Sequence, residues 1–350
     1  MDSPPAQPFV PELYDPQRPL TMRRVFMGPF GLRAGWSLLI YFAILASIVA
    51  SAYIVLHHIR ATHPHTVMTT RTAGTPASAV KSLTNAPMLT RVLLEDMTFP
   101  VFFLLSWLMA VIERRKLTVF GLGGTHPFRR FLVGAVWGFL AMSLLIFVLH
   151  SLRLLSFDTQ LLHGRAIPGW AIPGWAIAQL LAFLFVGLVE EYVYRGYLQF
   201  TLTRCLMGLG SFISRPHARA IAFWLASSVT SALFLLSHTS NGGENKPGLL
   251  QVFVVGFVFL AALWRTGSLW WAIGFHMTWD WAQSFLYGVP DSGGLMQGRL
   301  FVTHAWGNPL WSGGSAGPEG SVFCIPVLFL VIVVLCFTNS SPQPPLEAKS

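Results

Sequence analysis

The amino-acid sequence predicts an all-α, polytopic membrane protein with about eight transmembrane helices. Of its 350 residues, 53% are hydrophobic and only 11% are charged, whereas a water-soluble domain carries about a quarter charged residues. The mean hydropathy is +0.58. Long apolar runs recur along the chain, and as helices they can cover the roughly 30 Å hydrocarbon layer of a bilayer. This composition is that of an integral membrane protein.

Eight apolar runs account for the predicted spans, which lie at residues 36–57, 97–112, 131–152, 174–200, 218–237, 249–264, 268–287 and 322–337. The second and sixth runs are the weakest, because apolar cores of about 16 residues need flanking residues or a thinned bilayer to span. The spans divide the chain into four parts: a polar, Pro-rich N-terminal tail at 1–35, three spans with their loops at 36–173, a helical core at 174–287, and a Gly-rich loop, last span and tail at 288–350.

The distribution of basic residues predicts the orientation. Placing both termini in the cytoplasm puts 14 of the 23 lysines and arginines on the cytoplasmic side, as expected because basic loops resist translocation. We therefore predict a multi-pass protein of the plasma (inner) membrane, with cytoplasmic N- and C-termini. The net charge of +9 then reflects topology and contact with anionic lipid headgroups. The bilayer is a predicted partner, and nucleic acid is not.

Ionisable side chains inside the apolar runs are the strongest functional signal. Such residues are costly at membrane depth unless they are paired or solvated, so they are candidates for a functional site. The candidates are Glu190, Glu191, Arg195, His238, His276 and Asp280.

The segment around Glu190 combines an ion pair with a second carboxylate. On a helix, Glu191 and Arg195 are i, i+4 neighbours in the orientation that favours pairing, whereas Glu190 is rotated about 100° away. Glu190 therefore lies outside the arginine pair, and a carboxylate in an apolar site has the raised proton affinity that a general base needs near neutral pH. The alternative is that these residues form a structural ion-pair cluster that only holds helices together.

Two further spans contribute histidines. His238 ends the fifth span, and His276 with Asp280 forms an i, i+4 pair on one face of the seventh, an arrangement that commonly orients an imidazole. The set suits activation of water and stabilisation of an oxyanion in amide hydrolysis. The chain carries neither a Gly-x-Ser-x-Gly nor a His-Glu-x-x-His motif, so we predict water as the attacking nucleophile.

The sequence leaves metal dependence open. Glu190, His238 and His276 provide the nitrogen and oxygen ligands that Zn²⁺ prefers, with an open position for water. Water activated by Glu and His without a tightly held metal is an equally physical mechanism, and no organic cofactor is predicted. Cys205, Cys324 and Cys336 have no spacing that suggests a thiolate site or disulfides.

Three motifs in order resemble those of a known family. Glu190-Glu191-x-x-x-Arg195, Phe234-x-x-x-His238 and His276-x-x-x-Asp280 are similar to the motifs of the type II CAAX prenyl proteases. This family belongs to the CPBP group of intramembrane glutamic or metalloproteases, which also includes the Abi proteins. The resemblance covers residues 174–287, about a third of the chain.

The resemblance implies a helical membrane endopeptidase that acts on a membrane-associated protein or peptide, including prenylated CAAX-type substrates. Glu190 would activate water with help from His238, while Glu191 and Arg195 would support the site electrostatically. Asp280 stands where eukaryotic CAAX proteases often have Asn, which favours a role in orienting His276 or binding metal over oxyanion donation. The alternative from another class is a non-catalytic immunity or scaffold protein of the same fold; a transporter is less favoured, because the sequence shows no inverted repeat.

Overall fold

The computed structural model describes residues 26–28, 31–62, 92, 97–158, 171–239, 241, 243 and 245–338. Most of the predicted N-terminal tail, most of the loop at 58–96 and the end of the C-terminal tail lie outside the described residues. What was predicted for those segments stays a prediction.

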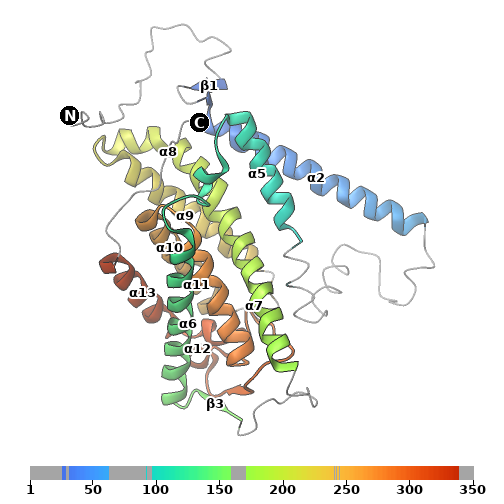
Figure 1. The fold of residues 1–350 in the computed structure, drawn as a ribbon, viewed down its shortest axis with the longest axis vertical. Coiled ribbons are helices and arrows are strands. Elements are labelled where there is room, and N and C mark those ends of the chain that lie inside the picture. The colour runs from blue at the N-terminus through green and yellow to red at the C-terminus, as the bar shows by residue number, and fades with distance from the viewer. Residues whose placement is uncertain are drawn as a thin grey trace.

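The described chain folds into a helical bundle (Figure 1). Its main helices are α2 (Ala34–Thr62), α5 (Phe99–Glu113), α6 (Pro127–Ser151), α7 (Ala171–Glu190), α8 (Gln199–Ile213), α9 (Ala218–His238), α10 (Lys246–Thr266), α11 (Trp270–Trp281) and α13 (Cys324–Thr338). Two π-helical segments, η2 (Glu191–Leu198) and η3 (Ala282–Leu286), follow α7 and α11. The short helical turns are η1 (Leu117–Phe120), α12 (Pro309–Ser312), η4 (Gly314–Ala316) and η5 (Pro318–Gly320).

Strands are a minor component of the described chain. β1 (Met27–Gly28) pairs with β2 (Gly31–Leu32), and β3 (Leu155–Phe157) pairs with β4 (Thr303–Ala305), both antiparallel. The second ribbon ties the end of α6 to the loop that follows η3. The fold is therefore all-α, as predicted, with two small ribbons at its loops.

Five described helical stretches are long and apolar enough to cross a membrane, namely Ala34–Val55, Pro127–Ser151, Ile172–Ile213, Ala218–His238 and Lys246–Thr266. They confirm the polytopic membrane protein, but the predicted count of eight full spans is only approximate. The second and eighth predicted spans are the 15-residue helices α5 and α13, and the seventh is the 12-residue α11 continued by η3. A 15-residue helix is only about 22 Å long.

Two predicted boundaries are corrected by the structure. The fourth span was expected to end at residue 200, yet the helical run continues to Ile213. It stops at Ser214, whose backbone is extended, just ahead of the Arg215-Pro216 step that disfavours a helix. The sixth span was expected to be short, but α10 has 21 residues. It begins at Lys246 because the Asn245 side chain caps this end, accepting from the Gly248 N–H at 2.8 Å.

Close contact between α6 and α11 fixes the centre of the bundle. Gly134 and Gly138 of α6 lie directly against the carbonyls of Trp271 and Phe275, and Gly274 of α11 lies against the carbonyl of Phe131. Small residues at such spacing let two helix backbones approach closely within a membrane. The position of α11, and of every side chain it carries, therefore depends on these glycines.

Gly138→Ala is expected to lower the free energy of unfolding by about 1–3 kcal/mol, because an added Cβ would overlap the Phe275 carbonyl and force the helices apart. The measurement is denaturant unfolding in detergent micelles, followed by circular dichroism. Gly208→Ala in α8 is the matched control, because a Cβ there meets nothing within 4 Å. Equal stability of the two variants would contradict the proposed tight contact.

Candidate active site

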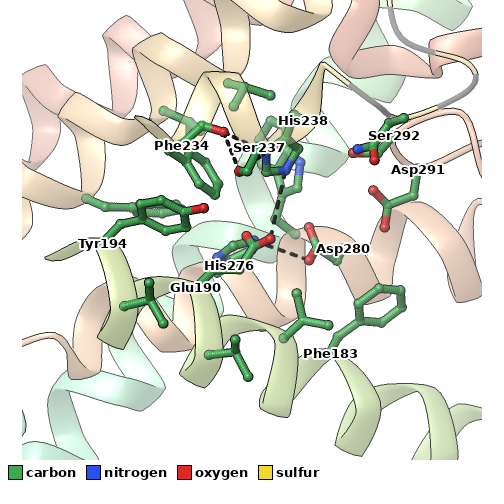
Figure 2. A pocket seen from close by; sticks show the side chains of 18 of the residues that line it. Phe183, Glu190, Tyr194, Phe234, Ser237, His238, His276, Asp280, Asp291 and Ser292 are labelled. Atoms are coloured by element: carbon green, nitrogen blue, oxygen red, sulfur yellow. Dashed lines mark hydrogen bonds and ion pairs between the residues drawn. The ribbon is translucent and has the colours of Figure 1, made fainter. Parts of the chain in front are cut away.

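A cavity of about 450 Å³ opens between the helices of the core. Figure 2 shows side chains that line it. The lining residues come from α5, α7, η2, α9, α10, α11 and η5, and from the loops that follow α9 and η3. One wall is apolar and carries Phe102, Phe183, Val186 and Val189. The cavity is also lined by ionisable groups. They include four of the six residues predicted from the sequence, namely Glu190, His238, His276 and Asp280.

The remaining two predicted residues, Glu191 and Arg195, form a buried ion pair directly behind the cavity. Both side chains are 0% exposed, and Arg195 Nη1 lies 3.1 Å from Glu191 Oε1. The guanidinium also lies over the ring of Phe234, 4.1 Å from its centroid, so the aromatic face stabilises the cation. The predicted pairing is thus confirmed, although it lies in the π-helical segment η2 rather than in a regular α-helix.

Glu190 is the last residue of α7, and its carboxylate faces two imidazoles. Its Oε2 lies 3.5 Å from His276 Nε2, and its Oε1 lies 3.9 Å from His238 Nε2. The carboxylate is outside the Glu191–Arg195 pair, as predicted, but it is paired with histidine. Three helices that are separate in the sequence therefore meet at this one carboxylate (Figure 2).

The backbone orients His238. Its Nδ1 lies 2.9 Å from the carbonyl oxygen of Phe234 one turn earlier, and because a carbonyl only accepts, Nδ1 carries the proton and donates it. The ring packs edge-on against the Phe234 side chain, with centroids 4.5 Å apart. Nε2 is thereby directed at Glu190 and is available to accept a proton.

Carboxylates flank His276 on both sides of its ring. Nδ1 donates to Glu191 Oε1 at 3.0 Å, while Nε2 lies 3.4 Å from Asp280 Oδ2 and faces Glu190. The ring stacks on Phe259, with centroids 5.3 Å apart. The predicted pairing of His276 with Asp280 is present, and Glu191 is a second orienting partner that spacing along α11 could not reveal.

The predicted zinc site consists of the Glu190 carboxylate and the imidazoles of His238 and His276. His238 and His276 both turn Nε2 towards Glu190, and each has its Nδ1 fixed by a hydrogen bond, as in many metal sites. Within the part of the chain that the structure describes, however, no group of three or more His, Cys, Asp or Glu side chains is placed to hold a metal ion. Zinc binding by Glu190, His238 and His276 stays a prediction.

Sequence reasoning missed three cavity residues. Asp291, Gln251 and Glu319 line the same cavity and are 7%, 3% and 7% exposed. Asp291 lies in a Pro-Asp-Ser-Gly-Gly stretch typical of a turn, and Glu319 lies in the Gly-rich loop before the last predicted span. The one available signal was that Glu319 is an isolated acid at the start of an apolar run.

Comparison with protein families finds one match in this part of the chain. The model of a family described as Rce1-like (type II CAAX prenyl endopeptidase Rce1-like) matches residues 172–282, which is about a third of the chain. The match begins in α7 and ends just after α11, so it includes all six predicted residues. Comparisons with curated proteins and with solved structures give no significant match. Residues 172–282 of this membrane protein are therefore similar to the Rce1-like family of type II CAAX prenyl endopeptidases.

Proposed function

We propose that the protein is an intramembrane endopeptidase that hydrolyses a peptide bond of a membrane-associated substrate, with water activated by Glu190. One observation carries this proposal: the Glu190 carboxylate faces the Nε2 atoms of two oriented histidines inside a cavity. An ion-pair cluster that served only to hold helices together would have no need of such a cavity or of two aligned imidazoles.

The first step is proton abstraction. Glu190 takes a proton from water, and the resulting hydroxide attacks the carbonyl carbon of the scissile bond. The Glu190 to His238 distance of 3.9 Å is too long for a direct hydrogen bond. Catalytic contacts are often this long before substrate binds and tighten in the complex. In this scheme His238 Nε2 assists by accepting a hydrogen bond from the same water.

The second step concerns the tetrahedral oxyanion. His276, when protonated at Nε2, stabilises the developing negative charge, and Glu191 and Asp280 hold the imidazolium in place. The proton on Glu190 then passes to the leaving amine as the carbon–nitrogen bond breaks. The products are a carboxylic acid and an amine, and Glu190 returns to its carboxylate form.

The family match and the cavity wall support the substrate class. A type II CAAX prenyl endopeptidase domain favours a prenylated CAAX-type peptide, and the apolar wall formed by Phe102, Phe183 and Val186 could accommodate apolar substrate groups. The positive-inside distribution of basic residues supports cytoplasmic termini and a plasma (inner) membrane location. Cleavage of the same peptide with and without a prenyl group measures whether the prenyl group is required.

Direct attack by water has a distinctive expected result. Purified wild-type protein should cleave a quenched fluorescent peptide, tested with and without a prenyl group, and hydroxylamine added during turnover should yield no peptide hydroxamate. A covalent acyl-enzyme would be trapped by hydroxylamine, whereas water attack leaves nothing to trap. Mass spectrometry of the products measures this, and accumulation of hydroxamate would contradict the role of Glu190 as a base acting on water.

The same assay tests the metal. The expected result for the scheme above is that turnover persists after dialysis against a chelator, because Glu190 and His238 supply the proton transfers themselves. Loss of turnover on dialysis with recovery on adding Zn²⁺ would instead assign Glu190, His238 and His276 as ligands. Metal content measured on the purified protein before and after dialysis is the control.

A further inference from the structure

Two uncharged polar side chains, those of Asn241 and Ser292, line the cavity beside the catalytic set. Figure 2 shows Ser292 with Asp291 at the end of the cavity where His238 lies. Asn241 and Ser292 are both half-buried. Neither the Asn241 amide nor the Ser292 hydroxyl has a hydrogen-bond partner among the described residues. Both groups can donate a hydrogen bond, so both are available to a ligand in the cavity.

Backbone contacts hold together the two segments that carry these residues. Asn241 follows α9, and its backbone N–H donates to the His238 carbonyl at 3.1 Å. Gly243, two residues later, lies directly against Gly293, the neighbour of Ser292. A Cβ added to either glycine would overlap the backbone of the other. Two side chains that are far apart in the sequence are therefore brought to the same cavity by a contact that has no room to shift.

The backbone of Ser292 is in the left-handed region, with φ +45°, and Gly293 follows at φ +76°. Two hydrogen bonds of 2.7 Å between Asp291 and Gly294 close this turn. Successive positive φ values are typical of a type I′ turn, which favours Asn and Gly. Glycine would adopt this conformation without the steric cost of a Cβ. Backbone outliers of this kind gather at functional sites, so the presence of serine points to a use for its hydroxyl.

A peptide that enters the cavity brings carbonyl oxygens that lose their contact with water. Each buried carbonyl needs a donor, or its desolvation costs free energy. The carboxylates in the cavity only accept, and both histidines already donate from Nδ1, His238 to a backbone carbonyl and His276 to a carboxylate. Asn241 and Ser292 are neutral donors. A carbonyl matches them better than a free carboxylate does, because Asp291 is the neighbour of Ser292 and repels negative charge.

We propose that Asn241 and Ser292 form a substrate-binding subsite that donates hydrogen bonds to backbone carbonyls of the peptide near the scissile bond. This assignment rests on the proposed peptidase function and deepens it by naming the substrate groups that the cavity holds. The oxyanion is assigned to His276, so the two donors position the peptide against Glu190 and take no part in proton transfer. Their loss should raise KM more than it lowers kcat.

Ser292→Gly tests the hydroxyl with little risk to the fold. Glycine suits the positive φ, so thermal unfolding in micelles should occur at the wild-type temperature or above it. The KM of the quenched peptide should rise about three- to tenfold, as expected for one lost hydrogen bond, while kcat stays within about twofold. Asn241→Ala should raise KM similarly. Ser292→Asn, which keeps a donor and tolerates a left-handed backbone, should recover part of the loss.

Ser228→Ala is the matched control, because it removes an exposed hydroxyl of α9 that does not line the cavity. It should leave both KM and kcat unchanged. A wild-type KM in both Ser292→Gly and Asn241→Ala would overturn the subsite. A Ser292→Gly variant that unfolds at a lower temperature than wild type would also overturn it, because the serine would then serve the fold.

Binding of modified peptides gives an answer that does not depend on turnover. Labelled peptides with one backbone carbonyl at a time replaced by a thiocarbonyl, a weaker acceptor, are compared by fluorescence anisotropy. The proteins are Glu190→Gln alone and Glu190→Gln combined with Ser292→Gly or Asn241→Ala. At one position the thiocarbonyl should weaken binding to Glu190→Gln by about threefold or more, and it should have no further effect once its donor is removed.

The same cycle separates the subsite from the peptidase function. If wild type cleaves nothing but this coupling is seen, the peptidase proposal fails and the subsite stands. If wild type cleaves the peptide but the effects of the thiocarbonyl and of each substitution add at every position, the subsite is overturned and the peptidase proposal stands.

Discussion

Glu190→Gln is expected to lower kcat for peptide cleavage by about a thousandfold, because general-base catalysis typically contributes 10²–10⁴. The amide keeps the size of the side chain but cannot take a proton from water. Its neighbours are already oriented by other groups: His238 by the Phe234 carbonyl and His276 by Glu191. The variant should therefore fold and bind peptide while losing turnover.

The measurement is steady-state cleavage of the quenched peptide in detergent micelles, with thermal unfolding of each variant recorded in parallel. Asp158→Asn removes a carboxylate that does not line the cavity and should keep wild-type kcat. Glu190→Asp, which retains the carboxylate at a shorter reach, should recover part of the lost rate. A Glu190→Gln variant that is folded and fully active would show that another group is the base.

The local parts of this site could be predicted because helical periodicity places side chains. Glu191 with Arg195, and His276 with Asp280, are i, i+4 neighbours, and both pairs are present at 3.1 and 3.4 Å. Burial of charged groups in apolar runs is costly, so their presence marked the site without any structure. Helical periodicity predicts only contacts between residues about one turn apart on the same helix.

The missed parts depend on contacts between distant segments. The hydrogen bond from His276 to Glu191 joins residues 85 positions apart, and Asp291 and Glu319 come to the cavity through glycine contacts between loops. Span ends were missed for a related reason, since the helical run that begins at Ile172 continues to Ile213 and α10 extends from Lys246 to Thr266, beyond the apolar runs that predicted them. Hydropathy reports burial in the bilayer, and it does not report where a helix ends.

Arg195→Met is expected to lower the free energy of unfolding by about 3–5 kcal/mol, the usual cost of removing one partner of a buried ion pair. Glu191 is 0% exposed, and its Oε2 already has no hydrogen-bond partner among the described residues. Without the guanidinium, the carboxylate would depend on His276 alone. Because methionine keeps an apolar contact with the Phe234 ring, the decrease in the free energy of unfolding measures the missing charge rather than lost packing.

A double-mutant cycle separates the ion pair from the arginine itself. Glu191→Leu combined with Arg195→Met removes both charges, so it should be less destabilising than Arg195→Met alone, because no buried charge is left unpaired. Arg219→Met is the matched control: this half-buried arginine lies near the Trp264 ring and makes no ion pair with a described carboxylate, so its loss should cost roughly 1 kcal/mol or less. Denaturant unfolding in micelles measures wild type, Glu191→Leu, Arg195→Met, the double variant and Arg219→Met. If the losses of stability in the two single variants summed to the loss in the double variant, Arg195 would not stabilise Glu191. The position of Glu191, and with it the orientation of His276, would then need another cause.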